Sequence, residues 1–367
     1  MSAPVRVALT MEQLWHRVPG GTAVAALELA GALRRRDDVI PVGVAARHGN
    51  PPPRAFQSPM PVKTLPLPRL ALYESWARLR RPAVERATGP VDLIHATAVA
   101  IPPASVPIVL TVHDLAWRHE PDHFTPRGVH FFRQHLEVAK RDVSLVFCSS
   151  EATRRDCLEA GFAPDLLRVV PLGARSIETT DDAIQLARAK HGLRRPYIMW
   201  AGTREPRKNL AGLLAAFVEL DRKGLDLVLV GPPGWGDEID TVISGMTGRI
   251  HVLGFVDRAE QAALYAGASV FCFPSLREGF GLPVLEAMHQ GTPVVTSLGT
   301  ATEEVAGDAA KLVEPRDPSA LAEALADVLD DPRLARDLGR RGRARAAEYT
   351  WDRSAQLVVD GYREVLT

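Results

Sequence analysis

Short apolar runs alternate with helical stretches along this chain, and the alternation starts a second time after residue 195. The apolar runs of the first series lie at residues 5–9, 39–44, 92–95, 108–112, 145–148 and 168–170. Helical patterns lie between them, at residues 22–36, 72–86, 129–140 and 151–160. Strand–helix–strand alternation produces parallel strands with right-handed crossovers. The first half of the chain is therefore predicted to form an α/β domain with a doubly wound parallel sheet.

The second series predicts a second sheet of the same kind. Its strands are expected at residues 197–201, 227–230, 250–253, 270–273 and 294–296, with helices at 209–223, 259–266 and 284–290. A polar, charged segment, 174–195, separates the two series and predicts a linker near residue 185. A length of 367 residues also favours two domains. We expect Rossmann-like domains over 1–180 and 190–350 that face a central cleft.

The composition excludes several classes of protein. Forty-four basic residues balance 44 acidic ones, so the chain lacks the basic field of a nucleic-acid-binding protein. The three cysteines are scattered without metal-ligand spacing, which favours buried thiols in a reducing compartment. The first residues do not resemble a signal peptide, and no apolar stretch is long enough to cross a bilayer. A cytoplasmic protein is expected.

The loop after the predicted strand 270–273 reads PSLREGFGLPVLEAMHQGTPVV and is the strongest candidate for a binding site. Gly279 and Gly281 allow the backbone to approach a ligand closely, and Pro283 suits the first turn of a helix. The backbone N–H groups of Phe280, Gly281 and Leu282 would then lie at a helix N-terminus, where phosphate binds readily. The alternative is a solvated loop followed by an ordinary helix.

Two glutamates flank this predicted helix start. Glu278 precedes it, and Glu286 follows about one helical turn later. A pair of carboxylates suits the vicinal hydroxyls of a sugar or a ribose. The segment from Ser275 to Met288 is therefore predicted to hold a phosphate with a hydroxyl-rich group on each side.

Three further loops could take part. Arg204, Arg207 and Lys208 follow strand 197–201 and could neutralise a diphosphate, although a chance cluster of charges is an open alternative.

His113 is the first polar residue after strand 108–112 and could bind a hydroxyl or move a proton; the alternative is a structural histidine paired with Asp114. His119 and His123 have irregular spacing that disfavours a metal site. A weaker signal is the pair Gly20 and Gly21 before the first helix, since Gly-x-Gly-x-x-Gly is absent.

Taken together, these loops resemble the family-4 retaining glycosyltransferases, which have the twin-Rossmann GT-B fold. The motifs that carry the resemblance are TVHDL, FCSSEATRRDC, VVPLGA, AGTREPRKNL, VLGFV, FPSLREGFGLPVLEAM and EVAGDAA. The resemblance implies a hexosyltransferase of bacterial glycan or glycolipid biosynthesis that needs a nucleotide-sugar donor and no obligatory metal. It also implies that the last helix, 351–367, crosses back to pack on the N-terminal domain.

The resemblance also implies roles for individual residues. Glu278 would contact the donor sugar, Glu286 the ribose and Lys208 the diphosphate. His113 would hold the sugar or the leaving phosphate, and the catalytic set would be His113, Glu278 and Lys208. Further donor contacts are expected from Gly20, Gly21, Thr203, Arg204, Arg207, Gly254, Phe255, Val256, Gly279, Phe280, Gly281 and Leu282.

One position departs from the family pattern. Many members have an arginine where this chain has Thr203, so Arg204 or Arg207 is expected to supply the missing charge. The GTREPRKNL sequence is similar to mannosyltransferase-like members, which favours GDP-mannose as the donor. The acceptor would be a glycan, a glycolipid or a small molecule.

Two other questions remain open on the sequence alone. Residues 69–86 combine Leu, Tyr and Trp with five arginines and could form a membrane-surface helix; an ordinary amphipathic helix packed on the sheet is the favoured alternative. A nucleotide-sugar 2-epimerase of the same fold, or a non-catalytic nucleotide-sugar-binding protein, are the alternatives to a transferase.

Overall fold

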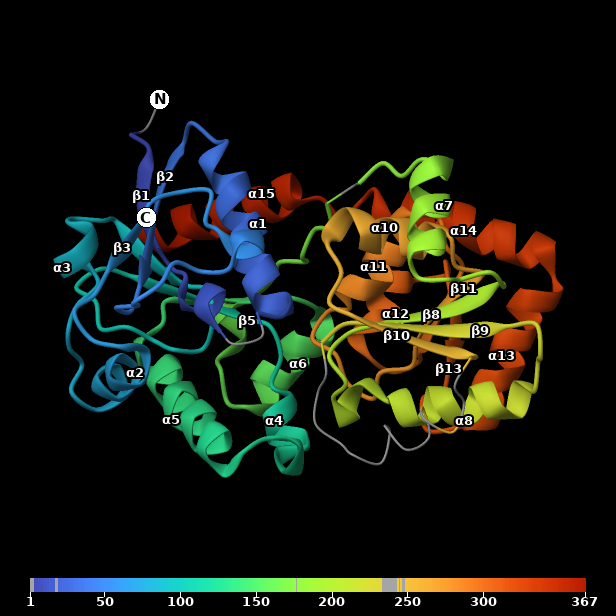
Figure 1. The fold of residues 1–367 in the computed structure, drawn as a ribbon. Coiled ribbons are helices and arrows are strands. Elements are labelled where there is room, and N and C mark those ends of the chain that lie inside the picture. Colours follow the sequence, from blue (N-terminus) through green and yellow to red (C-terminus); the bar gives the residue numbers. More distant parts are fainter. Residues whose placement is uncertain (1–2, 17–18, 176, 233–242, 244, 246–247) are drawn as a thin grey trace. The chain divides into compact units, whose positions relative to one another are not determined.

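The computed structural model describes residues 3–16, 19–175, 177–232, 243, 245 and 248–367 (Figure 1). The chain forms two compact units. Unit 1 comprises residues Met1–Gly173 and Thr350–Thr367, and unit 2 comprises Ala174–Tyr349. Each unit contains one sheet in which all neighbouring strands are parallel. The fold class predicted from the alternating pattern is thereby confirmed.

The sheet of unit 1 has seven strands in the order β3-β2-β1-β4-β5-β6-β7. They are β1 Val5–Thr10, β2 Val39–Ala45, β3 Val62–Thr64, β4 Leu93–Ala96, β5 Ile108–Val112, β6 Leu145–Cys148 and β7 Leu167–Val169. Of these seven strands, only β3 was not expected from the sequence. It has three residues between Pro61 and Pro66, too few for a periodic pattern to be detected.

Seven α-helices of unit 1 are described. They are α1 Gly21–Arg34, α2 Arg69–Arg78, α3 Glu85–Thr88, α4 Ala116–His119, α5 Pro126–Asp142, α6 Glu151–Glu159 and α15 Trp351–Leu366. The helices α1 and α15 pack together on one face of the sheet, whereas α2 and α5 contribute to the cores on the other face (Figure 1). The expected single helix over 72–86 is wrong: α2 ends at Arg78, and Arg80 (φ 54°) and Pro82 break the helical path before α3.

The last helix, α15, is joined to the sheet through a buried histidine. His95 Nδ1 lies 2.7 Å from the Tyr362 hydroxyl of α15, and His95 Nε2 lies 2.7 Å from Thr111 Oγ1 of β5. Burial lowers the pKa of His95 to about 3, so its ring is neutral at physiological pH. A Cβ at Gly361 would lie 2.6 Å from the Phe147 ring, so the close contact between α15 and β6 requires this glycine.

The sheet of unit 2 has the order β10-β9-β8-β11-β12-β13. Its strands are β8 Tyr197–Ala201, β9 Asp226–Val230, β10 Ile250–Gly254, β11 Val270–Phe273, β12 Val294–Ser297 and β13 Lys311–Val313. The described helices are α7 Asp181–Lys190, α8 Leu210–Leu220, α10 Arg258–Ala266, α11 Leu282–His289, α12 Ala301–Ala306, α13 Pro318–Asp330 and α14 Pro332–Ala346. Within this unit α8 packs on α13, while α7 packs on α10 and α14 on α11.

The linker expected near residue 185 is instead the helix α7. Thr180 caps its N-terminus by accepting a hydrogen bond from the Ala183 N–H. Arg188 Nη1 donates to the carbonyl of Gly267 at 3.3 Å, and His191 Nε2 lies 2.6 Å from Glu260. Most of the surface of α7 is exposed, and its sequence is accordingly polar. A polar helix of this kind has the same composition as a linker.

Two arginines of α14 bind backbone carbonyls of neighbouring helices. Arg343 Nη2 donates to the carbonyl of Gln290 at 2.8 Å, next to the C-terminus of α11. Arg345 Nη2 donates to the carbonyl of Glu304 at 2.9 Å in α12. Both cations therefore stabilise C-terminal helix carbonyls.

The strand orders locate the expected binding region of each unit. In unit 1 the order reverses between β1 and β4, and in unit 2 it reverses between β8 and β11. Ligands of open parallel sheets bind beyond the carboxyl ends of the strands at such a switch point. In the described part of the chain, none of the helices has the length and apolar character needed to span a membrane.

Candidate active site

The loops after β8 and β11, which flank the switch point of unit 2, are bound to each other. The backbone N–H of Leu276 donates to the carbonyl of Arg207 at 2.7 Å. Ser275 Oγ lies 3.0 Å from the same carbonyl. The two loops were predicted separately from the sequence, and the structure brings them together. They meet because β8 and β11 are neighbours in the sheet, although the strands are far apart in the chain.

Three charged side chains meet between these loops. Arg207 Nη1 lies 3.0 Å and Lys208 Nζ 3.3 Å from Glu278 Oε1. The side chains of Glu278 and Lys208 are only 10% and 11% exposed, so their charges are weakly screened by solvent. Lys208 Nζ also lies 5.0 Å from the centre of the Phe273 ring. The result is a largely buried cluster of opposite charges at the switch point.

The space for Lys208 depends on Gly202, directly after β8, and Gly202 is in turn packed against Gly231, directly after β9. A Cβ at Gly202 would lie 3.0 Å from Lys208 Cδ, so a side chain there would displace the lysine. A Cβ at Gly231 would lie 2.1 Å from the carbonyl oxygen of Gly202, an impossible distance. The sequence alone indicates no role for these glycines, because their neighbours in space are determined by the sheet.

The charge of Glu278 is stabilised by its neighbours. Burial alone would raise the pKa of this carboxyl, but Arg207 and Lys208, with hydrogen bonds from Ser275 and Lys208, lower it below its ordinary value. Glu278 is therefore ionised at neutral pH. An ionised carboxylate accepts hydrogen bonds only, as contact with sugar hydroxyls requires.

This shift of the pKa predicts a pH dependence of stability. A carboxyl whose pKa is lower in the folded state stabilises the fold above its ordinary pKa of 4.5, and this stabilisation is lost as the pH falls through the folded-state value. Glu278→Gln has no such titration. We expect the melting temperature of the wild type to exceed that of Glu278→Gln at pH 7, and the difference to narrow below about pH 4.5. A difference that stays constant between pH 7 and pH 3, measured by calorimetry, would contradict this assignment.

The helix α11 begins where the sequence predicted a phosphate site. Gly281 caps it with φ 108°, a left-handed conformation that favours glycine, and a Cβ there would lie 2.8 Å from Thr302 Cγ2. Pro283 lies in the first turn, as predicted. The first-turn N–H groups of any α-helix lack acceptors within the helix, so this N-terminus can bind an anion.

Glu286 lies in the second turn of α11 beside a buried tyrosine. The Tyr265 hydroxyl donates to Glu286 Oε2 at 3.2 Å and accepts from Gln261 Nε2 at 3.2 Å. Burial, and then the charge of Glu286, raise the pKa of Tyr265 well above its ordinary value, so its hydroxyl keeps its proton. Neither Tyr265 nor Ser275 was assigned a role from the sequence, since their partners are defined by tertiary contacts.

Arg207 is occupied by protein carboxylates. Its Nε lies 2.8 Å from Glu205 Oε2, while its Nη1 contacts Glu278 and the carbonyl of Arg277. This arrangement favours a structural role for Arg207. Of the two arginines expected to replace the charge absent at Thr203, Arg204 is the better candidate; its side chain is partly exposed and also has contacts of its own.

The residues expected beside the base follow β10. Gly254 has φ 68°, and its carbonyl accepts from the Gly231 N–H at 2.8 Å. Phe255 is 66% exposed, whereas Val256 is buried. All three lie at the carboxyl edge of the same sheet, and a base could reach Gly254 and Phe255.

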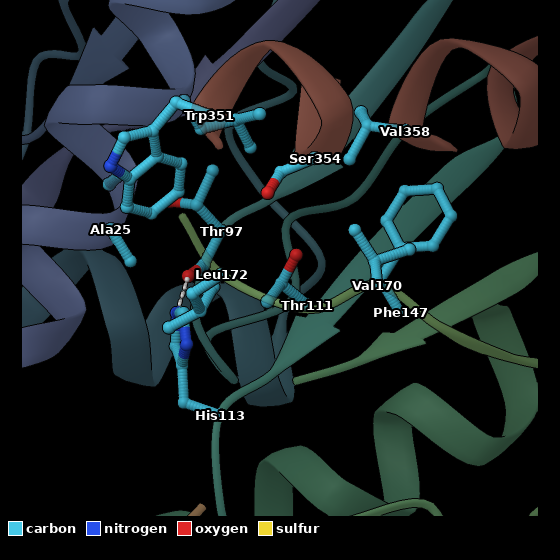
Figure 2. Close-up of a pocket in the computed structure, with 12 residues that line it drawn as sticks. Ala25, Thr97, Thr111, His113, Phe147, Val170, Leu172, Trp351, Ser354 and Val358 are labelled. Carbon is cyan, nitrogen blue, oxygen red and sulfur yellow. Dashed lines mark hydrogen bonds between the residues drawn. The ribbon is translucent and has the colours of Figure 1, made fainter. Parts of the chain in front are cut away.

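In unit 1, His113 lies at the end of β5 with its ring held by a neighbouring loop. Its Nε2 lies 3.2 Å from the Thr97 carbonyl oxygen, the dashed line in Figure 2. A carbonyl only accepts, so Nε2 carries the proton. Asp114 and this hydrogen bond raise the pKa of His113, but burial lowers it by more. The pKa is therefore below its ordinary value, and the ring is neutral at physiological pH. Nδ1 then bears a lone pair that can accept from a hydroxyl.

Thr97 is itself fixed at the switch point between β1 and β4. Its N–H donates to Thr10 Oγ1 at 3.0 Å, and its hydroxyl accepts from Gln13 Nε2 at 2.6 Å. The carbonyl of His113 accepts from Ser149 Oγ at 2.8 Å. The ends of four strands therefore hold His113, although the sequence indicated only its position after β5.

The cavity next to His113 is too small for a substrate. Its volume is about 20 Å³, enough for about one water molecule. His113 borders it together with Leu172 and with Trp351 and Ser354 of α15 (Figure 2). His113 is therefore packed against the segments where the chain leaves unit 1 and returns to it.

The other histidine and glycine signals of unit 1 have simpler environments. His119 Nε2 lies 3.0 Å from Asp156, and with Glu159 these residues form an exposed cluster of a kind that is common without a metal ion. Gly20 caps α1, and no described atom lies within 4 Å of a Cβ built on it. Packing does not require a glycine there, so the donor contact expected of Gly20 and Gly21 stays a prediction.

Together the fold and the site define a class of protein. Two doubly wound units with a buried lysine, a helix N-terminus and two carboxylates at one switch point describe a GT-B glycosyltransferase. Comparison with known proteins agrees. Residues 19–175 match the model of Glycosyltransferase Family 4, and residues 183–345 match that of Glycosyl transferases group 1.

Curated relatives are similar over most of the chain. This chain is 30% identical over 265 residues to the O-antigen chain mannosyltransferase B of Escherichia coli, and the similarity covers 70% of each protein. It is 29% identical over 368 residues to the phosphatidyl-myo-inositol mannosyltransferase of Mycolicibacterium smegmatis, covering 95% of this chain and 91% of that protein. The chain belongs to the family-4 glycosyltransferases and is mannosyltransferase-like.

Solved structures show the same fold. Anabaena Alr3699/HepE in complex with UDP and glucose superimposes with a TM-score of 0.78 at 21% identity, covering 98% of this chain and 100% of that one. WaaG, a glycosyltransferase involved in lipopolysaccharide biosynthesis, has a TM-score of 0.73 at 17% identity, covering 96% and 98%. The predicted GT-B fold is thus confirmed, and the family models and curated relatives confirm the assignment as a glycosyltransferase.

Proposed function

We propose that this protein transfers mannose from GDP-mannose to a hydroxyl of a glycan or glycolipid acceptor, with retention of the anomeric configuration. The observation that carries the donor site is the meeting of Lys208, Glu278 and the N-terminus of α11 at the switch point of unit 2. The choice of mannose is supported by the mannosyltransferases among the relatives. The alternative donor is UDP-glucose, which binds to Alr3699/HepE.

In this proposal the diphosphate lies at the N-terminus of α11 and near Lys208. The N–H groups of Phe280, Gly281 and Leu282 donate to phosphate oxygens, and Lys208 supplies a positive charge. Glu278 accepts hydrogen bonds from the sugar and Glu286 from the ribose. The contacts of His113, Gly20 and Gly21 with the donor are proposed on the family resemblance, and the lone pair on Nδ1 suits His113 to a sugar hydroxyl.

The transfer step needs no protein nucleophile. The bond from the anomeric carbon to the leaving diphosphate breaks, and a bond to the acceptor oxygen forms on the same face of the sugar. The acceptor proton moves to an oxygen of the leaving diphosphate. Lys208 and the helix N-terminus stabilise the negative charge that develops there.

A thermal-shift series with GDP, UDP, ADP and dTDP tests the donor site. A ligand that binds only the folded protein stabilises it by about 2.7 kcal/mol at one hundred times its Kd. We expect GDP to raise the melting temperature most. A larger rise in melting temperature with UDP would indicate that the donor is a UDP-sugar. No rise with any of the four nucleotides would contradict the proposed function.

Incubation with the donor alone separates a transferase from an epimerase. The transferase releases little sugar without an acceptor and leaves the configuration of the donor sugar unchanged. A donor whose sugar changes configuration at C2 would instead establish the 2-epimerase alternative.

The segment 69–86, a candidate membrane-surface helix, contributes apolar side chains to the core of unit 1. In α2, which covers part of the segment 69–86, the apolar residues Leu72 and Trp76 are buried against the sheet of unit 1. The amphipathic pattern of the segment is therefore explained by packing. Leu70 and Leu79 remain exposed, at 53% and 70%, and Arg78 pairs with Glu74.

A further inference from the structure

Two buried hydroxyl groups lie directly behind the two carboxylates of the donor site. Ser275 Oγ lies 3.1 Å from Glu278 Oε1, and the Tyr265 hydroxyl lies 3.2 Å from Glu286 Oε2. The residues are 0% and 1% exposed, so a ligand does not reach either hydroxyl. Resting on the proposed function, we propose that Ser275 and Tyr265 are positioning residues, which orient Glu278 toward the sugar and Glu286 toward the ribose of the donor.

Ser275 helps to fix one oxygen of Glu278 and leaves the other for a ligand. The contacts of Glu278 with Ser275, Arg207 and Lys208 all involve Oε1. Within the described residues, no hydrogen bond to Oε2 is found. A carboxylate held in this way presents Oε2 in a defined direction, as recognition of a sugar hydroxyl requires.

The hydroxyl of Ser275 has one proton and three neighbouring acceptors. Besides Glu278 Oε1, the carbonyls of Arg207 and Arg277 lie 3.0 and 3.1 Å away. The carboxylate is the strongest acceptor because it is charged. The carbonyl of Arg207 also accepts from the Leu276 N–H at 2.7 Å, so it does not depend on the serine.

The backbone at Ser275 is held in place independently of its side chain. Ser297 Oγ of β12 donates to the carbonyl of Ser275 at 2.6 Å. Removing the Ser275 hydroxyl should therefore leave the loop in place. The expected consequence is a Glu278 side chain with greater freedom to rotate.

Tyr265 holds Glu286 in a similar way from the other side. Its ring packs edge to face on Phe271 at 5.1 Å, and its carbonyl accepts from Thr292 Oγ1 at 2.7 Å. Gln261 Nε2 donates to the Tyr265 hydroxyl, which directs the phenolic proton toward Glu286. The ring and the hydroxyl are thus fixed before any ligand binds.

The two positioning residues should affect different parts of the donor. A nucleoside diphosphate contains the ribose but lacks the sugar. Loss of the Ser275 hydroxyl should therefore weaken binding of the nucleotide sugar alone, whereas loss of the Tyr265 hydroxyl should weaken binding of the nucleotide sugar and the nucleoside diphosphate equally. General damage to unit 2 would not produce this difference.

The test measures affinities of Ser275→Ala and Tyr265→Phe by calorimetry for GDP and GDP-mannose, and in parallel for UDP and UDP-glucose. For the pair of ligands that binds the wild type, we expect Ser275→Ala to bind the nucleotide sugar about 5-fold more weakly. Its affinity for the nucleoside diphosphate should be unchanged. Tyr265→Phe should weaken both about 5-fold. The control is Tyr197→Phe, which removes another buried hydroxyl of unit 2, bonded to the Leu264 carbonyl, and should change neither affinity.

Each outcome is decisive. Equal weakening of both ligands by Ser275→Ala, or no weakening by either variant, would overturn the positioning roles. If Ser275→Ala does not fold, Ser275→Cys keeps the side-chain shape with a weaker donor and should show the same pattern. A wild type that binds none of the four ligands would instead contradict the proposed function, not the positioning roles alone.

Discussion

Glu278→Gln is expected to lower the rate of sugar transfer by about 100- to 1,000-fold, the range seen when one preorganised polar contact to a transition state is removed. Glutamine keeps the length of the side chain but loses its negative charge. The charge of Glu278 is maintained by Arg207 and Lys208 in a buried site, where its interaction with a developing positive charge on the sugar is weakly screened. Affinity for the nucleoside diphosphate should be nearly unchanged, because this ligand lacks the sugar.

Loss of stability should not account for the lost activity. The hydrogen bonds of a charged group contribute about 1.5–3 kcal/mol each, so Glu278→Gln should melt several degrees lower but remain folded at 25 °C. Glu205→Gln is a matched control, because Glu205 also contacts Arg207 from the same loop, at 2.8 Å. It should retain most of the transfer rate. A Glu278→Gln enzyme with wild-type turnover would show that Glu278 has only a structural role.

The switch-point loops could be predicted because their signals are local. Strands β8 and β11 are buried apolar runs, each followed directly by glycine, proline and charged residues, and Pro283 and Gly281 mark the start of α11. Such patterns depend on neighbours in the sequence. The same local logic failed at α7, where a solvated polar helix has the composition of a linker.

The precise geometry could not be predicted because it depends on residues distant in the chain. The proton on His113 Nε2 is fixed by the carbonyl of Thr97, and the hydroxyl of Thr97 accepts in turn from Gln13. Ser275 meets Arg207 only because β11 lies beside β8. A sequence can indicate that a carboxylate lies near a phosphate site. It does not reveal which hydroxyl holds that carboxylate or which arginine is already paired.

Lys208→Met should show a different pattern from Glu278→Gln and is the second large effect expected. Methionine keeps an unbranched chain in the space that Gly202 leaves and against the Phe273 ring, but it removes the charge. The diphosphate is present in both the nucleoside diphosphate and the nucleotide sugar. Both should therefore bind at least about 10-fold more weakly, as expected for loss of one charge-assisted contact of about 1.5–3 kcal/mol.

The transfer rate of Lys208→Met should fall more than its affinity, to about 100- to 1,000-fold below the rate of the wild type. The reason is that the negative charge on the diphosphate increases as the diphosphate leaves. Lys190→Met, which removes an exposed lysine paired with Glu260, is the control and should leave binding and transfer unchanged. Unaltered affinity of Lys208→Met for the diphosphate would place this lysine outside the phosphate site. Weakening of both ligands by Lys208→Met, and of the nucleotide sugar alone by Glu278→Gln, would assign each residue to its own part of the donor, because the two ligands differ only in the sugar.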